Sequence, residues 1–327
     1  ETLDEARIRM QKNLEKLLFS TLLLFTACSF ATADNIVSRG YYPTDNINEL
    51  SIDLVYENIE IKGIHGDEFL VEIESNNSKR IPKVSVENSK LVIETQKRTS
   101  VFGNKCTVYL YIPNEFYSSN SSIKSTSGDV TIEDFETGSI SINTTSGDIE
   151  ITSLDVQEDI NIVSTSGDID FLYGKAKVFS AKLTSGDIEL KDFTAEEITC
   201  EITSGDIETE KLECDYFSFK TTSGDIDCYN TVCQYFDIRS TSGSVNIKLD
   251  NQLEADSSII TNSGAVKVTV PEEMEFQIRA SSSSGKLEDN FNDNTYHPKH
   301  DFVSKYNGGG VEIQVETTSG NIELDSN

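Results

Sequence analysis

Two rows of acidic residues recur along the chain at a spacing that could bind a cation. An Asp directly follows each of six Ser-Gly pairs, and in five of these repeats a second acid stands two residues further on. The first row is Asp129, Asp148, Asp168, Asp187, Asp206 and Asp225, and the second row is Glu150, Asp170, Glu189, Glu208 and Asp227. Hard cations such as Ca²⁺ prefer clustered carboxylates. A pair of carboxyl groups at a defined distance could also hydrolyse a glycosidic bond.

The spacing of the Ser-Gly pairs predicts the elements that carry these acids. The Gly residues recur every 19 to 21 residues from Gly128 to Gly285, and once more at Gly320. Apolar and polar residues alternate on both sides of each Gly, which is typical of half-buried strands. One repeat is too short to bury an apolar face alone, so the copies must stack. We therefore expect an all-β chain that forms a single-stranded, right-handed parallel β-helix with rungs of about 19–20 residues.

In this arrangement the Thr-Ser-Gly-Asp stretch is a corner between two strands. Gly provides a backbone conformation that a Cβ would resist, and the Ser, Thr and Asp side chains satisfy turn amides. Like positions stack about 4.8 Å apart, so Ile residues form interior columns and both acidic rows point outward. Neighbouring acids then repel by roughly 0.9 kcal/mol per pair in bulk water. The rows are either structural, with turn hydrogen bonds and salt offsetting this repulsion, or they bind Ca²⁺ or a basic partner.

Less regular segments flank the repeats. Residues 34–120 alternate in short stretches broken by Gly, Asn, Asp or Pro, and we interpret them as degenerate opening rungs and an N-terminal cap. Residues 121–327 hold the regular repeats, with a predicted loop insertion at 286–310 that is rich in Asn, Asp, His and Gly.

Residues 1–33 indicate an export signal, with a basic region followed by an apolar run too short to span a bilayer comfortably. Residues 1–9 are interpreted as an upstream extension or start-site artefact before Met10. Two cleavage sites fit the sequence: an A-x-A site that ends at Ala33, or a lipobox in which Cys28 would be acylated. Such a lipid would be the only membrane anchor that the sequence predicts.

The net charge of −29 excludes several classes of function. Such a surface repels nucleic acid and anionic lipid, and it attracts cations and basic partners. No EF-hand loop and no nonapeptide of Ca²⁺-binding β-rolls is present, so we expect no cofactor and at most weak Ca²⁺ binding. A glycosidase needs one unique pair of carboxyl groups, whereas these acids repeat identically along the face. We therefore expect no enzymatic activity.

Other chemically active residues give weaker signals. Basic residues that could pair with neighbouring acids stand four residues before some of the repeat Gly residues, at Lys124, Lys182, Lys220 and Arg239. Cys214 and Cys233 both follow a repeat Gly by nine residues, so they should stack on adjacent rungs, where a disulfide or two buried thiols would fit. His297 and His300 are three residues apart, but nothing in their loop would orient them as zinc ligands, so no metal site is expected.

The order of these features resembles a bacterial family of adhesin-like proteins catalogued as DUF4097. The likeness covers roughly residues 45–327, with degenerate strands, an Ile112-Pro113 strand end, several SGDI rungs and a Gly-rich turn before TTSGNIEL. This chain departs from the family in its loop at 286–310 and in lacking Asp after the last four repeat Gly residues. The resemblance implies a right-handed β-helix of the cell envelope, an adhesive role and no established catalytic residues.

The sequence thus predicts an exported cell-envelope β-helix that serves as an adhesive or structural binding surface. Its partner would be an envelope or surface protein or a glycan, and not nucleic acid. One alternative is an envelope scaffold that self-associates end to end through exposed rungs. A polysaccharide-active enzyme is the third alternative.

Overall fold

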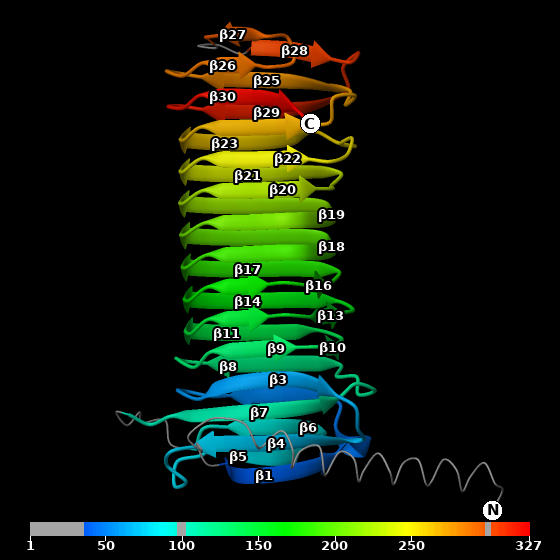
Figure 1. Ribbon diagram of the computed structural model, residues 1–327, viewed down its shortest axis with the longest axis vertical. Helices are drawn as coiled ribbons and strands as arrows, with labels where there is room; N and C mark the ends of the chain where they lie inside the picture. Colours follow the sequence, from blue (N-terminus) through cyan, green and yellow to red (C-terminus); the bar gives the residue numbers. More distant parts are fainter. Residues whose placement is uncertain (1–35, 97–102, 298–301) are drawn as a thin grey trace, which may run out of the picture. The chain divides into compact units, whose positions relative to one another are not determined.

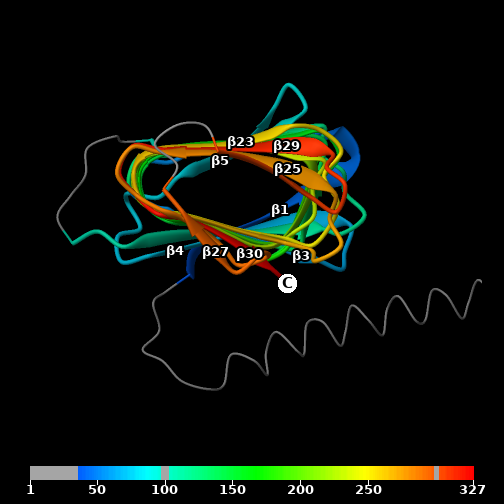
Figure 2. The same cartoon turned by 90° about the horizontal axis from the view of Figure 1, so that it is seen from above.

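The structure, a computed structural model, describes residues 36–96, 103–297 and 302–327, in which β-strands wind into a stack of coils (Figure 1). Seen from above, these coils enclose a flattened oval (Figure 2). The described residues contain one short 3₁₀ turn, η1 (Thr44–Asn46), and no α-helix. The predicted all-β parallel β-helix is confirmed.

Two long sides and one short side make up the regular coils, and like strands pair in parallel. Side A precedes each Ser-Gly corner and contains β8 (Asn120–Ser125), β11 (Ile140–Ser146), β14 (Asp159–Ser166), β17 (Val178–Ser185), β21 (Tyr235–Ser242) and β23 (Ser257–Ser263). Side B follows the corner and contains β9 (Val130–Glu133), β12 (Ile149–Ile151), β15 (Ile169–Phe171), β20 (Ile226–Thr231), β22 (Val245–Leu249) and β24 (Val266–Val270). The short side contains β10 (Phe135–Thr137), β13 (Leu154–Val156) and β16 (Gly174–Lys175). β18 (Ile188–Ser204) and β19 (Ile207–Ser223) pass through all three sides without a break.

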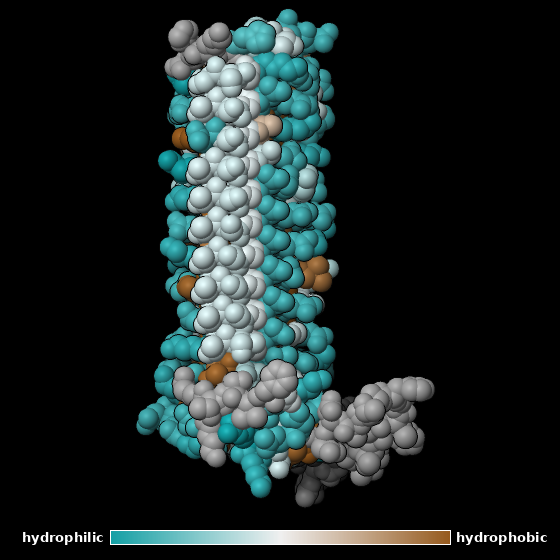
Figure 3. Space-filling model, turned by 90° about the vertical axis from the view of Figure 1, so that its left-hand side faces the viewer, coloured by the Kyte–Doolittle hydropathy of each residue, from teal (hydrophilic) through white to brown (hydrophobic). Residues whose placement is uncertain are grey.

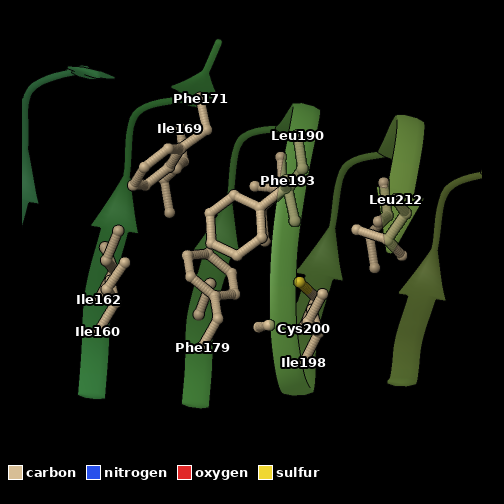
Figure 4. Packing of buried hydrophobic residues seen from close by; sticks show 14 of the residues in the cluster. Ile160, Ile162, Ile169, Phe171, Phe179, Leu190, Phe193, Ile198, Cys200 and Leu212 are labelled. Atoms are coloured by element: carbon tan, nitrogen blue, oxygen red, sulfur yellow. The ribbon is translucent and has the colours of Figure 1, made fainter. Parts of the chain in front are cut away.

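Apolar residues alternate with polar ones along these strands and point inward, where they form the core. Ile169, Ile188 and Ile207 stand two residues after successive corner Gly residues, pair in register, and are at most 1% exposed. Phenylalanines fill the wider part of the interior, where Phe171 and Phe193 pack edge to face with ring centroids 5.2 Å apart (Figure 4). Interior columns of like residues were predicted from the repeat, and the structure confirms them.

The corner requires Gly for two reasons. Gly205 has a φ of +140°, in the region that favours Gly. A Cβ on Gly205 would also lie 2.0 Å from the carbonyl oxygen of Gly186, the corner residue of the preceding coil. Corner backbones therefore stack in direct contact, and the tightness of this contact was not expected from the sequence.

Buried Ser and Thr residues lie three positions before most corner Gly residues, where an apolar residue would be expected; Leu183 and Ile202 are the exceptions. The hydroxyls of Thr221, Thr261 and Thr317 each donate to the carbonyl oxygen of a corner Gly in the neighbouring coil, at 3.3, 3.3 and 3.2 Å. These bonds satisfy carbonyl groups at the corner that the strand ladders leave free.

At the N-terminal end, the coils do not stack in chain order. The strands are β1 (Ile36–Pro43), β2 (Glu49–Asp53), β3 (Asn58–Ile64), β4 (Glu68–Ser75), β5 (Lys83–Glu87), β6 (Lys90–Glu94) and β7 (Cys106–Pro113). The first coil, β2 and β3, lies between the coil of β6 and β7 and the coil of β8 and β9, in parallel register with both. Antiparallel strands then cover the end, because β4 pairs with β7, β1 with β4, and β5 with β6.

The C-terminal end repeats this arrangement. Its strands are β25 (Phe276–Ser282), β26 (Leu287–Asp289), β27 (Asn294–Tyr296), β28 (Phe302–Tyr306), β29 (Val311–Thr317) and β30 (Ile322–Ser326). The last coil, β29 and β30, is inserted between the coil of β23 and β24 and the coil of β25 and β26. β27 and β28 pair antiparallel with β26 and β25 and cover the end.

The stretch 286–310, predicted as a loop insertion, therefore contains β26, β27 and β28. Tyr306 on β28 stacks on Phe276 with ring centroids 4.7 Å apart, and its hydroxyl donates to the buried carboxylate of Asp289 at 2.8 Å. The polar composition suggested a loop, but these contacts hold β28 against the coil of β25 and β26. The final segment also lies one coil inside the end, rather than closing it.

Candidate functional site

The first acidic row forms a hydrogen-bonded ladder along side B. Each Asp accepts, at its Oδ1, a hydrogen bond from the backbone N–H of the Asp in the next coil. From Asp129 to Asp225 the donor–acceptor distances are 3.2, 3.0, 2.9, 2.8 and 2.7 Å. The structural interpretation of this row thus has a direct basis, because backbone N–H donors offset the repulsion between neighbouring carboxylates.

Residues other than Asp occupy both ends of the ladder. Asn58 Oδ1 accepts from the N–H of Asp129 at 3.1 Å, and Asp225 Oδ1 accepts from the N–H of Ser244 at 2.7 Å. In the inserted coil, Asn321 Oδ1 accepts from the N–H of Lys286 at 3.2 Å. An uncharged side-chain oxygen can therefore serve as the acceptor at this position, and the negative charge is not required.

Replacing Asp187 tests this requirement. Asp187→Asn keeps the acceptor for the N–H of Asp206, so we expect a free energy of unfolding within about 0.5 kcal/mol of the wild type. Asp187→Ala removes the acceptor and is expected to cost about 1 kcal/mol. Urea unfolding followed by circular dichroism measures both. Equal stability of the Asn and Ala variants would mean that the hydrogen bond contributes nothing.

The second acidic row also stacks in register, as expected. Glu150 lies beside Asp170, Asp170 beside Glu189, Glu189 beside Glu208, and Glu208 beside Asp227. Partial burial, together with the nearby acids, chiefly Glu189, raises the pKa of Asp170 above its usual value. Lys191 forms an ion pair with Glu189 and neutralises part of the row.

Asp170 is accordingly expected to weaken the fold at neutral pH. Its proton is held more tightly in the folded chain than in the unfolded one, so folding is favoured less as the pH rises from about 3.8 through the raised pKa. Asp170→Asn should raise the urea midpoint at pH 7, and the gain should shrink toward pH 3.8. Asp155→Asn is the control, since Asp155 has Lys175 as its neighbour in the next coil. A gain in both variants would point to net charge alone as the cause.

The described residues provide no group of side chains that could together hold a metal ion. Across 36–96, 103–297 and 302–327, no three His, Cys, Asp or Glu side chains converge as ligands for an ion. His297 lies at the end of the described segment, and His300 lies outside it. Weak Ca²⁺ binding by the acidic rows stays a prediction.

The cysteines lie in the core. Cys214 and Cys233 occupy the same position in adjacent coils and are free thiols, 8% and 2% exposed. Burial raises the pKa of the Cys214 thiol to about 12, so it remains protonated and unreactive at neutral pH. Cys200 and Cys228 are fully buried and act as small hydrophobic residues of the core.

The predicted basic residues lie on side A, where Lys182, Lys220 and Arg239 pair with acids of that side. Glu201 lies between Lys182 and Lys220, with Nζ–O distances of 3.3 and 3.5 Å, and Arg239 Nε lies 3.0 Å from Asp237. They do not neutralise the acidic rows, which lie beyond the corner. The corner itself, made of Thr, Ser and Gly, forms a pale, uncharged band along the stack between hydrophilic surfaces (Figure 3).

Sequence reasoning missed a groove on side A. Its volume is about 630 Å³, and it crosses the coils that contain β19, β21, β23, β29 and β25. Lys220, Arg239, Ile260 and Glu316 line it together with Ser, Thr and Asn side chains. The one available signal was Ile260, an apolar residue at the outward position that Lys220 and Arg239 occupy in the two preceding repeats.

The predicted export signal at 1–33, the A-x-A site and the lipobox with Cys28 lie outside the described residues. Within the described residues, no helix has the length and apolar character needed to cross a membrane.

These features define the class: a parallel β-helix with regular polar rows on its outer surface. The chain belongs to the Toastrack DUF4097 family, whose sequence model matches residues 155–325, which confirms the resemblance drawn from the repeats. A second family model, described as "Putative auto-transporter adhesin, head GIN domain", matches residues 51–231. No curated protein is significantly similar to the chain.

Solved structures of similar proteins include a "putative adhesin" from Parabacteroides distasonis and "a putative adhesin" from Parabacteroides merdae. The first is 12% identical over 88% of this chain and 96% of its own, with a TM-score of 0.47. The second is 13% identical over 88% and 95%, with a TM-score of 0.43. At these identities and scores, the two structures say nothing about what this chain binds.

Proposed function

We propose that this protein is an exported, non-catalytic component of the bacterial cell envelope that acts as an adhesive binding surface. The observation that carries the proposal is its membership in families described as Toastrack and as an auto-transporter adhesin head domain. The outer surface supports it, because stacked coils present rows of like side chains in register over the length of the stack. Such a surface can contact an extended partner at many points.

A non-catalytic role agrees with the chemistry of the acidic rows. The Asp side chains that sequence reasoning singled out are engaged with backbone N–H groups, coil after coil. A glycosidase needs two carboxyl groups with different environments at one place. The first row repeats one environment from coil to coil and provides no such pair, so we expect no glycan turnover.

An end-to-end scaffold is the weaker alternative. Each end of the stack is covered by antiparallel strands in place of an open rung. The outermost strand β1 ends in Pro43 and carries Arg39, which pairs with Glu72 of β4, and β28 carries Lys305. Charged residues and Pro on edge strands discourage pairing with another copy.

Protease treatment of intact cells, followed by blotting with a periplasmic protein as control, tests the proposed location. We expect loss of this protein while the periplasmic control survives. Beads coated with purified protein should also adhere to cells or surfaces more than beads coated with albumin. Protection from the protease in intact cells, together with no adhesion, would refute the adhesive role.

A further inference from the structure

The groove on side A has a shape that restricts its ligand. It extends across five adjacent coils and has a volume of about 630 Å³. At a strand spacing of about 4.8 Å, five coils correspond to a length of roughly 19 Å. A ligand that fills the groove is therefore an extended chain that runs along the axis of the stack, across the strands.

Each of the two basic side chains that line the groove forms an ion pair with an acid. Lys220 Nζ lies 3.5 Å from Glu201, and Arg239 Nε lies 3.0 Å from Asp237. Glu316, the acid in the lining, accepts a hydrogen bond from a neighbouring glutamine at 2.7 Å. In a chain of net charge −29, an anion is repelled at long range and a cation is drawn to the acidic rows instead. The ligand that suits this groove is polar and uncharged.

The lining combines many hydrogen-bonding groups with one apolar contact. Thr241, Asn262 and Thr318 contribute hydroxyl and amide groups, and the half-buried Ile260 lies among them. Sugar residues match this composition, since their hydroxyls donate and accept while the ring presents an apolar C–H face.

A peptide matches the groove less well. Peptides that bind to sheets usually add as a strand to a free edge. Here β21, β23 and β29 are each paired along both edges, so their backbone groups are already used. Only side chains remain to contact a ligand, and the strand spacing is close to the length of one pyranose residue.

We infer that this groove binds a neutral oligosaccharide, with about one sugar residue over each coil and a ring against Ile260. The inference rests on the proposed adhesive function and names the class of its ligand. It places the binding surface on side A, away from the acidic rows, which were the candidate binding residues in the sequence.

Two matched pairs of variants test the assignment. Ile260 and Val163 both stand four residues before a corner Gly and point outward from side A, but only Ile260 lines the groove. Lys220 and Lys182 both pair with Glu201, at 3.5 and 3.3 Å, and only Lys220 lines the groove. Ile260→Lys and Lys220→Ala are therefore compared with Val163→Lys and Lys182→Ala.

The probe is an array of neutral and acidic oligosaccharides incubated with the purified full-length protein, whose fold is checked by thermal unfolding. We expect binding to neutral oligosaccharides that Ile260→Lys weakens at least about tenfold, because bound sugar would desolvate the new ammonium group. Lys220→Ala should weaken it less, and the Val163 and Lys182 controls should bind like the wild type.

Several outcomes would overturn the inference while leaving the adhesive function intact. One is adhesion of the coated beads to cells without any signal from neutral sugars, or with a signal from acidic sugars alone. Another is adhesion lost after the cells are treated with protease but retained after treatment with glycosidases. Equal weakening by Ile260→Lys and Val163→Lys would place the ligand elsewhere. Absence of adhesion to cells would instead count against the proposed function itself.

Discussion

Ile188→Asp is expected to abolish cooperative folding. Ile188 is 1% exposed and stacks in register between Ile169 and Ile207 of the adjacent coils. The new carboxylate would be buried without a partner, which costs on the order of 5 kcal/mol or more. That loss is comparable with the whole stability of many domains. Far-UV circular dichroism and urea unfolding measure the effect.

Asp187→Asn, one residue earlier in the chain, is the matched control. Its side chain is exposed, and Asn can accept the same backbone hydrogen bond, as Asn58 does at the start of the ladder. This variant should unfold cooperatively at a midpoint close to that of the wild type. If both variants behaved alike, the assignment of alternate residues to core and surface would be wrong.

Gly205→Ala is expected to cost about 3 kcal/mol or more. The φ of +140° is unfavourable for any residue with a Cβ, and that Cβ would lie 2.0 Å from the carbonyl oxygen of Gly186. Two neighbouring corners would have to separate, which would weaken the ladder bond from the N–H of Asp206 to Asp187 as well. Differential scanning calorimetry should show a clearly lower melting temperature.

Gly66→Ala provides the comparison. A Cβ on Gly66, in the turn between β3 and β4, would meet no atom within 4 Å. We expect its free energy of unfolding to stay within about 0.5 kcal/mol of the wild type. Should Gly205→Ala melt at the same temperature as Gly66→Ala, the close stacking of the corners would be refuted.

The regular coils could be predicted because their neighbours follow from the period. Residues 19 positions apart, such as Ile188 and Ile207, have the same place in successive repeats and pair in register. The outward direction of Asp187 follows from the alternation beside them. The role of Asp187 could not be predicted from the alternation. An exposed carboxylate that binds a cation and one that accepts a hydrogen bond from a backbone N–H have the same sequence pattern.

The order of the end coils could not be predicted from local patterns. Ile59 of β3 pairs with both Val108 and Val130, although the three residues belong to distant parts of the chain. Every coil presents the same apolar columns to its neighbours above and below, so alternation alone does not specify which coil follows which. Contacts specific to the ends, such as the hydrogen bond from Tyr306 to Asp289, lie outside the repeat pattern.

The groove escaped prediction for the same reason. Ile260 lies beside Arg239 on one side and beside Glu316 on the other. The first pair is 21 residues apart, close to the period, whereas the second is 56 residues apart. Glu316, Thr317 and Thr318 line the groove only because the last coil is inserted next to β23. The order of the repeats in the sequence therefore does not predict that these residues lie beside Ile260.

The insertion of β29 and β30 also constrains the order in which the chain can fold. These strands pair with β23 and β24 on one edge and with β25 and β26 on the other. A nascent chain that adds coils one after another would leave this slot vacant until residues 311–326 emerge. The native order of this end is therefore established only after residues 311–326 have emerged. The coils at this end therefore cannot reach their native order by adding one after another along the chain, as the coils of a simple repeat array can.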